Sequence, residues 1–272
     1  MRRNHAKRRP AQADAPRPGA AERPAFSRRE TRDDGEGPLW LWGTHAVLAA
    51  LANPARSLHT LLATENAAAK LVSPRLAPQL VTAKELDHRL PPGAVHQGIA
   101  LKADPLEAAL LEDVIAEGAT RLAVLDQVSD PHNLGAILRS AAAFGFTGLV
   151  LQTRNAPPIT GVVAKSAAGA AETVTEIRAV NIARALETLA EAGFHTVGLA
   201  GESQRPLHMA VAGAEKLAVV LGAEGSGLRP AVAKACAELA RIPISAQMES
   251  LNVSNAAAIA FYEAGRGSFP PR

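Results

Sequence analysis

The stretch LAVVLGAEGSGLRP, residues 217–230, runs from five consecutive apolar residues directly into a loop that contains three glycines. Apolar runs without polar alternation are typical of strands buried on both faces, as in parallel sheets. Glycines permit a positive φ and let the backbone approach another group closely. The stretch therefore predicts a parallel strand that ends at a ligand-binding edge, because ligands of open α/β sheets lie beyond the carboxyl ends of the strands.

Similar apolar runs occur at five other places after residue 120, separated by helical or loop segments. They are RLAVLDQV (121–128), TGLVLQ (147–152), ETVTEIRAV (172–180), FHTVGLA (194–200) and LARIPIS (239–245). This alternation predicts a parallel α/β domain over residues 119–272. Taken alone, it predicts an unknotted, doubly wound sheet.

A smaller α/β unit is predicted over residues 38–103. Its elements are a helix at 43–53, a strand at 58–64, a helix at 83–90 and a strand at 96–103. Residues 104–118 are predicted to form a connecting amphipathic helix, with Leu106, Leu110 and Ile115 on one face.

Residues 1–37 form a basic tail that is predicted to be disordered, because it is rich in Arg, Pro and Ala and shows no apolar period. The tail holds 10 Lys/Arg against 6 Asp/Glu, whereas the remainder holds 19 against 20. The net charge of +3 is therefore a property of the tail. Such an arm either holds a phosphate backbone loosely or is a solvated extension with no specific role.

Several classes of protein are excluded by composition. No apolar run reaches the roughly 18 residues of a membrane span, and the amino terminus lacks the apolar segment of a signal peptide. Cys236 is the only cysteine, which excludes an internal disulfide and a cysteine-rich zinc cluster and fits a reducing cytoplasm. No metal is implied.

Two further predicted strand ends carry unusual polar residues. In DPHNLGAILRSAAAFG (130–145), Asn133 suits a helix N-cap, and Arg139 stands in an otherwise apolar helix, either at a site or at the surface. In IPISAQMESLNVSNAAAIAFYEA (242–264), four short polar residues precede or open a helix that needs only one cap. They are Ser250, Asn252, Ser254 and Asn255. The glycine loop lacks the GK[ST] ending of a phosphate-binding loop, which argues against a nucleotide hydrolase.

These segments together closely resemble the three motifs of the SpoU family, which are RNA ribose 2′-O-methyltransferases of the SPOUT superfamily. The motif segments are DPHNLGAILRSAAAFG, LGAEGSGL (221–228) and IPISAQMESLNVSNAAAIAFYEA. Two more segments, GTHAVLAAL (43–51) and AVHQGIAL (94–101), look like the substrate-binding domain of the bacterial 23S rRNA guanosine 2′-O-methyltransferase branch. The resemblance covers about residues 39–267.

The resemblance implies a fold that alternation alone does not predict. It implies an α/β SPOUT domain whose carboxyl-terminal part forms a trefoil knot, preceded by a small α/β substrate-binding domain similar to ribosomal-protein-like RNA-binding modules. It also implies an obligate homodimer, with the site built at the subunit interface.

For the site, the resemblance implies S-adenosylmethionine as methyl donor, held by Gly222, Ile242 and Leu251. Arg139 is implied as the central catalytic residue, supplied across the dimer interface. A guanidinium stays protonated in proteins, so we expect Arg139 to bind phosphate and stabilise developing alkoxide charge rather than act as a base. The other polar motif residues are expected to orient Arg139, the ribose and the loop. They are Asn133, Glu224, Ser250 and Asn252.

The substrate is left open between a guanosine in 23S rRNA, favoured by the first-domain resemblance, and a tRNA ribose. A catalytically silent RNA-binding or ribosome-assembly protein is the rival hypothesis from another class. Only 3% of residues are aromatic, so stacking platforms for single-stranded bases are scarce. RNA recognition is therefore expected to depend on local basic patches, shape and the tail.

Overall fold

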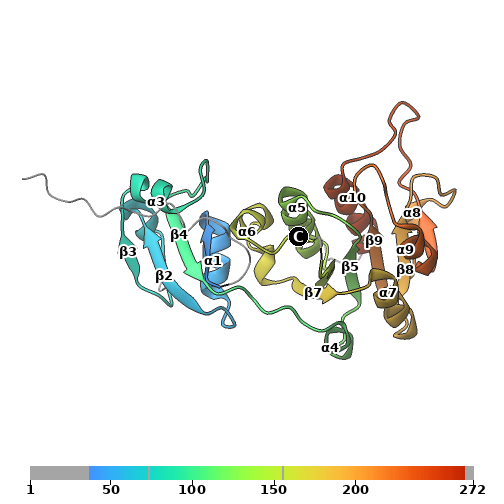
Figure 1. Ribbon diagram of the computed structural model, residues 1–272, viewed down its shortest axis with the longest axis horizontal. Coiled ribbons are helices and arrows are strands. Elements are labelled where there is room, and N and C mark those ends of the chain that lie inside the picture. Colours follow the sequence, from blue (N-terminus) through green and yellow to red (C-terminus); the bar gives the residue numbers. More distant parts are fainter. Residues whose placement is uncertain (1–36, 73, 155, 267–272) are drawn as a thin grey trace, which may run out of the picture. The chain divides into compact units, whose positions relative to one another are not determined.

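The computed structural model describes residues 37–72, 74–154 and 156–266 of the 272-residue chain. The tail predicted to be disordered lies outside the described residues, except for Gly37. The described residues form two β-sheets with their covering helices (Figure 1). None of the helices in these ranges is long and apolar enough to cross a membrane.

The first sheet has four strands in the order β1-β4-β2-β3. Strand β4 pairs antiparallel with both β1 and β2, and β3 pairs parallel with β2. The strands are β1 (Leu39–Trp42), β2 (Leu58–Ala63), β3 (Pro78–Leu80) and β4 (Ile99–Ala103), and the helices are α1 (Thr44–Ala52), α2 (Glu65–Ala68) and α3 (Ala83–Arg89). The predicted helices at 43–53 and 83–90 and the predicted strand at 58–64 are thus confirmed.

Some elements of this sheet differ from the prediction. Strand β1, of sequence LWLW, was not predicted, because its four apolar residues show no alternation. Its strand identity comes from pairing with β4, where Leu39 lies opposite Ala103. The strand predicted at 96–103 begins only at Ile99, since Gln97 adopts a positive φ of 57° and turns the chain.

The second sheet has six strands in the order β10-β8-β9-β5-β6-β7, and all of its pairings are parallel. The strands are β5 (Arg121–Leu125), β6 (Gly148–Gln152), β7 (Thr175–Ala179), β8 (His195–Leu199), β9 (Leu217–Leu221) and β10 (Glu238–Ala240). Each lies in one of the six apolar runs, although β10 only overlaps the start of its run. The parallel α/β prediction is confirmed.

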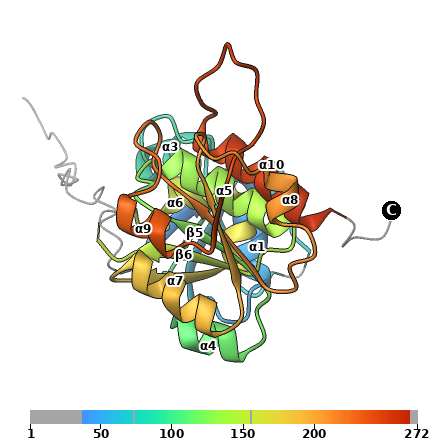
Figure 2. The same cartoon turned by 90° about the vertical axis from the view of Figure 1, so that its right-hand side faces the viewer.

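Helices cover both faces of this sheet (Figure 2). Successive residues of β5 and β9 alternate between two apolar cores, as expected for strands with period-two side chains. One core includes residues of α5 (Pro131–Ala143), α6 (Gly161–Ala167), η1 (Ala170–Glu172), α8 (Leu207–Ala210) and α10 (Val253–Gly265). The other includes residues of α4 (Leu111–Ala116), α7 (Ile182–Glu191) and α9 (Pro230–Ala235).

The connecting helix predicted over residues 104–118 is wrong in its extent. Only Leu111–Ala116 is helical, and Leu110, expected on the apolar face, is 64% exposed. The backbone N–H of Ala109 instead donates to the carbonyl of Glu176 at 2.8 Å, and Ala109 forms a parallel bridge with Ile177 of β7. Strand β7 is the edge of the sheet, so pairing with its free side overrides the local helical pattern.

Candidate active site

A cavity of about 410 Å³ opens at the carboxyl ends of β8, β9 and β10, which are neighbours in the sheet. Its wall includes Leu199 at the end of β8, Gly222 just after β9 and Ile242 just after β10. The volume falls within the roughly 300–1,000 Å³ of small-molecule sites. The cavity lies at the edge of the sheet where the sequence predicts ligand binding.

The loop after β9 explains why three glycines occur within six residues. Ala223 and Gly227 exchange backbone hydrogen bonds of 3.1 and 3.0 Å, which fold the loop back on itself. Gly225 and Gly227 adopt φ values of +80° and +67°, the left-handed region that favours glycine. A Cβ on Gly222 would lie 2.2 Å from the carbonyl carbon of Gly227, so this turn closes only without a side chain.

Three predicted site residues form one hydrogen-bonded cluster, of which Glu224 lies in the cavity wall. Asn133 Nδ2 donates to Glu224 Oε1 at 3.0 Å, and Asn252 Nδ2 donates to the same oxygen at 2.6 Å. Asn252 Nδ2 also lies 3.1 Å from Asn133 Oδ1. The backbone N–H of Val253 adds a third donor to Glu224 Oε1 at 3.3 Å. One carboxylate oxygen is thus held by three donors, and Oε2 has no partner among the described residues.

The two asparagines play different local roles. Asn252 is the N-cap of α10, because its Oδ1 accepts from the backbone N–H of Ser254 at 2.9 Å. Asn133 has a side chain suited to an N-cap, but the structure does not use it so: Asp130 caps α5 by accepting from the backbone N–H of His132. Asn133 stands inside the first turn and is only 9% exposed, so its side chain is free to reach Glu224.

The cavity wall also holds Ser250 and Leu251, so it gathers all three residues predicted to bind the cofactor and two predicted to be catalytic. Arg139 lies elsewhere. Six residues separate it from Asn133, which on an α-helix is about 9 Å of rise and a different face. Arg139 is exposed and lines a separate depression of about 440 Å³ together with His45 and Ala49. It makes no hydrogen bond or ion pair within residues 37–72, 74–154 and 156–266.

The sequence prediction missed an ion pair beside the glycine loop, between the buried Asp126 and Arg229, whose side chain is 37% exposed. Asp126, fully buried after β5, accepts from Arg229 Nε at 2.7 Å and from the backbone N–H of Arg229 at 2.9 Å. Because Arg229 follows the glycine loop, this pair ties the loop to the end of β5. A carboxylate directly after a buried apolar run was the signal available in the sequence, since buried charges require partners.

Two family models match the chain in consecutive segments. Residues 40–109 match the model described as RNA 2′-O ribose methyltransferase substrate binding. Residues 121–262 match the SpoU rRNA Methylase family. The first match covers the four-stranded sheet, and the second covers the parallel sheet, the glycine loop and most of α10.

Curated relatives share this arrangement at substantial identity. The chain is 37% identical over 241 residues to the 23S rRNA (guanosine-2′-O-)-methyltransferase RlmB of Vibrio cholerae, covering 83% of this chain and 96% of the relative. It is 40% identical over 239 residues to an uncharacterized tRNA/rRNA methyltransferase of Synechocystis. That match covers 82% of this chain, which spans only 61% of the length of the relative.

A solved structure supports the fold. The AdoMet-bound rRNA methyltransferase of Sinorhizobium meliloti superimposes with a TM-score of 0.70 at 23% identity. The match covers 86% of this chain and 88% of that protein. The fold of the described residues is therefore the one seen in solved rRNA methyltransferases.

Proposed function

The chain belongs to the SpoU rRNA methylase family, and on this premise we propose that it methylates a guanosine ribose of 23S rRNA. It is an S-adenosylmethionine-dependent RNA 2′-O-methyltransferase. The observation that carries this assignment is that two distant segments line one cavity, the glycine loop and residues 242–251. The first turn of α5 joins them through the hydrogen bond of Asn133 to Glu224 in the cavity wall.

The cavity fits the methyl donor in volume and in chemistry. Apolar wall is supplied by Ile242 and Leu251, and the glycine loop brings backbone groups close to the interior without side-chain bulk. We assign Gly222, Ile242 and Leu251 to hold S-adenosylmethionine, which when bound supplies an electrophilic methyl group on its sulfonium.

The polar cluster is suited to orient an RNA ribose at the rim. Glu224 is held through Oε1, so its second oxygen is available to accept a hydrogen bond from a substrate hydroxyl. Ser250, also in the cavity wall, offers a hydroxyl that donates or accepts. Arg139 binds the phosphate of the target nucleotide and stabilises negative charge that develops on the 2′-oxygen.

We propose that a second copy completes the site, and this is supported by Arg139 lining a different depression from the cavity of its own chain. Apolar side chains on α10 support a homodimer: Tyr262 is 50% exposed and Ile259 is 38% exposed. Helix α10 packs on α5, where Phe144 meets Tyr262 edge-on at 5.8 Å between ring centroids. We assign the dimer contact to this α5–α10 surface, with the carboxyl-terminal segment knotted as in the SPOUT superfamily.

We divide the chain into a basic tail (1–37), a substrate-binding domain (38–103), a connection (104–118) and a catalytic domain (119–272). The substrate-binding domain favours ribosomal RNA, because the matching family model is described as substrate binding. A protein that acts on ribosomal RNA works in the cytoplasm, which the single cysteine also suits.

Mixing two inactive variants tests both the reaction and the dimer. Arg139→Ala and Glu224→Ala are expected to abolish transfer of labelled methyl groups from S-adenosylmethionine to undermethylated ribosomal RNA. When the two are co-expressed, a mixed dimer regains one intact site, so statistical assembly restores about a quarter of wild-type activity. No recovery would place Arg139 and the cavity of one chain in the same site.

The position of the methyl group decides the substrate. Mass spectrometry of the product should find a 2′-O-methylguanosine in 23S rRNA. Methylation of transfer RNA in its place would reassign the substrate. Binding of ribosomal RNA without any transfer by the wild-type protein would favour a silent binding protein.

A further inference from the structure

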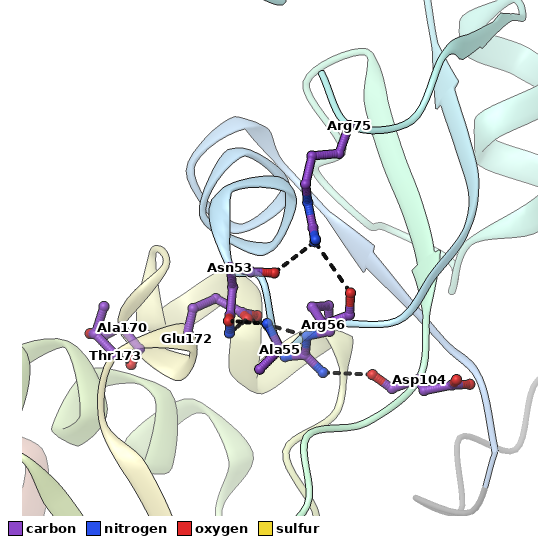
Figure 3. A network of polar contacts seen from close by, with 8 residues as sticks. All are labelled: Asn53, Ala55, Arg56, Arg75, Asp104, Ala170, Glu172 and Thr173. Carbon is purple, nitrogen blue, oxygen red and sulfur yellow. Dashed lines mark hydrogen bonds and ion pairs between the residues drawn. The ribbon is translucent and has the colours of Figure 1, made fainter. Parts of the chain in front are cut away.

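A buried ion pair joins the substrate-binding domain to the catalytic domain (Figure 3). Neither of its residues has a role in the proposed methyl transfer. Arg56 follows α1, and Glu172 ends η1. Arg56 Nη2 lies 2.6 Å from Glu172 Oε1, and Arg56 Nε lies 3.2 Å from Glu172 Oε2. The two side chains are only 3% and 4% exposed, so water screens the pair little.

The partners of this pair fix it from the substrate-binding side. Asn53 Nδ2 donates to Glu172 Oε2 at 2.8 Å, and Arg56 Nη1 donates to the carbonyl of Asp104 at 2.7 Å. Arg75 holds the turn that carries these residues, because its guanidinium donates to the carbonyls of Asn53 and Arg56 at 2.6 and 3.2 Å. Both oxygens of Glu172 are therefore occupied by donors from the other domain (Figure 3).

A second contact between the same domains lies at the start of α1. Lys165 Nζ of α6 donates to Gln97 Oε1 at 2.9 Å, and the same oxygen accepts from the backbone N–H of Thr44. The backbones of α6 and β1 also approach closely here. A Cβ added to Gly161 would lie 2.1 Å from the carbonyl oxygen of Trp40. Two separated contacts resist rotation of one domain on the other better than a single contact does.

Between these contacts lies the depression of Arg139. Its wall combines His45 and Ala49 of α1 with Arg139 of α5 and the turn after α6. Helix α1 thus borders the proposed phosphate-binding arginine, and the position of α1 depends on Arg56 and Glu172.

We propose that Glu172 is a positioning residue: by holding Arg56 and Asn53 it locks the substrate-binding domain beside Arg139, so that RNA bound by one domain is presented to the other. This inference rests on the proposed function. Apolar residues of α1 and α6 pack in one core, and this packing is non-directional. The buried ion pair adds a directional contact that restricts small movements of one domain on the other. A lock that removes this motion raises the effective concentration of domain-bound RNA at the site.

The test compares Glu172→Gln and Glu172→Ala in the full-length protein. The Gln variant keeps the shape of the Glu172 side chain and an oxygen that accepts from Asn53. It therefore still tests the proposal if the Ala variant does not fold. We expect the KM for ribosomal RNA to rise about tenfold with little change in kcat. The affinity for S-adenosylmethionine should be unchanged. Arg56→Gln should have the same effect, and the double variant should be no worse than either single one.

Glu238→Gln is the control. It removes an ion pair with Arg205, but both residues of this pair belong to the catalytic domain, so the contact between the domains is kept. Hydrogen exchange at the backbone N–H groups of α1, followed by mass spectrometry, reports loosening of the contact between the domains. It should accelerate in the Glu172 variants and not in the control. An unchanged RNA KM, or an equal loss of RNA and S-adenosylmethionine binding, would refute the lock. Filter binding of RNA needs no turnover, so failure of the lock is distinguishable from failure of the proposed reaction.

Discussion

Glu224 illustrates how a side chain outside regular structure is held in a single position. Its Oε1 accepts from Asn133, 91 residues away in sequence, and from Asn252, 28 residues away. Each donor belongs to the first turn or the cap of a helix, α5 or α10, whose backbone is rigid. A carboxylate fixed in this way loses little conformational entropy when a substrate binds, which favours a precisely oriented reaction.

Asn133→Ala should lower kcat about a hundredfold, because it removes one of the three donors to Glu224 and the acceptor of Asn252. Affinity for S-adenosylmethionine should change little. Steady-state methylation kinetics provide the measurement. Asn181→Ala is the matched control, since Asn181 caps α7 and lies outside the cavity wall. Equal kcat values for the two variants would exclude a role for Asn133 in orienting Glu224.

Cys236 should be inert in the folded protein. Burial, and secondly the negative charge of Asp126, raise the pKa of its thiol from 9.0 to about 12. At pH 8 the thiolate fraction is then about a thousandfold lower in the folded than in the unfolded chain, and alkylation depends on thiolate. Iodoacetamide labelling with and without urea measures this ratio. Equal rates in both states would contradict it.

The same shift predicts how stability depends on pH. Between pH 9.0 and about 12 the unfolded chain releases the Cys236 proton and the folded chain retains it. The contribution of this thiol to the free energy of unfolding therefore falls as pH rises through that window. Cys236→Ala should flatten the dependence, as measured by urea denaturation at pH 8 and pH 10.

At the scale of elements, the cavity depends on a loop with no regular structure. The glycine loop is closed by its own backbone hydrogen bonds and anchored by the pair of Asp126 and Arg229. Helix α9 begins directly after this anchor, at Pro230. The loop is thus fixed at both ends by neighbouring elements, which lets backbone groups serve as a preformed binding surface.

Gly222→Ala should weaken S-adenosylmethionine binding by more than about tenfold, because its Cβ would overlap backbone atoms of Gly227 and Leu228 and force the loop to move. Gly201→Ala is the matched control. Gly201 lines the same cavity, but its added Cβ would meet no atom within 4 Å. Isothermal titration with S-adenosylmethionine measures both. Similar losses in the two variants would assign the effect to general crowding of the cavity.

At the scale of the whole molecule, the two sheets share one apolar core. That core includes Leu41 of β1 and Val47 of α1 from the substrate-binding domain. It also includes Leu149 of β6 and Val163 of α6 from the catalytic domain. The buried pair of Arg56 and Glu172 lies at the same junction. Removing one partner of a buried ion pair costs about 3–5 kcal/mol, because the other charge is left buried and unpaired. Glu172→Ala should therefore lower the free energy of unfolding as well as disturb the placement of the domains.

Methyl-donor binding should stabilise the whole fold. At a free concentration of one hundred times Kd, a ligand specific to the native state adds about 2.7 kcal/mol. For a chain of this size that corresponds to a rise in Tm of about 5–10 °C. Scanning calorimetry with and without S-adenosylmethionine measures the shift, and Gly222→Ala should reduce it. An unchanged Tm in the wild-type protein would argue against donor binding in the cavity.

The parallel sheet could be predicted from sequence because each strand carries its own signal. The runs at Leu217–Leu221 and Arg121–Leu125 are apolar on both faces, and that pattern is local. The same local reasoning failed for residues 104–110 and for Leu39–Trp42. In both places pairing with another strand, β7 or β4, decides the conformation, and no property of the segment itself reveals the partner.

The parallel sheet, the order of the three motif segments and the residue types available to the site can all be predicted from the amino-acid sequence. Tertiary packing brings Asn133 to Glu224 and places Arg139 away from the cavity of its own chain. It also brings Arg56 into contact with Glu172, although 116 positions separate them in the sequence. Periodicity and capping act within a few residues of the chain, whereas these contacts depend on how distant elements pack against one another.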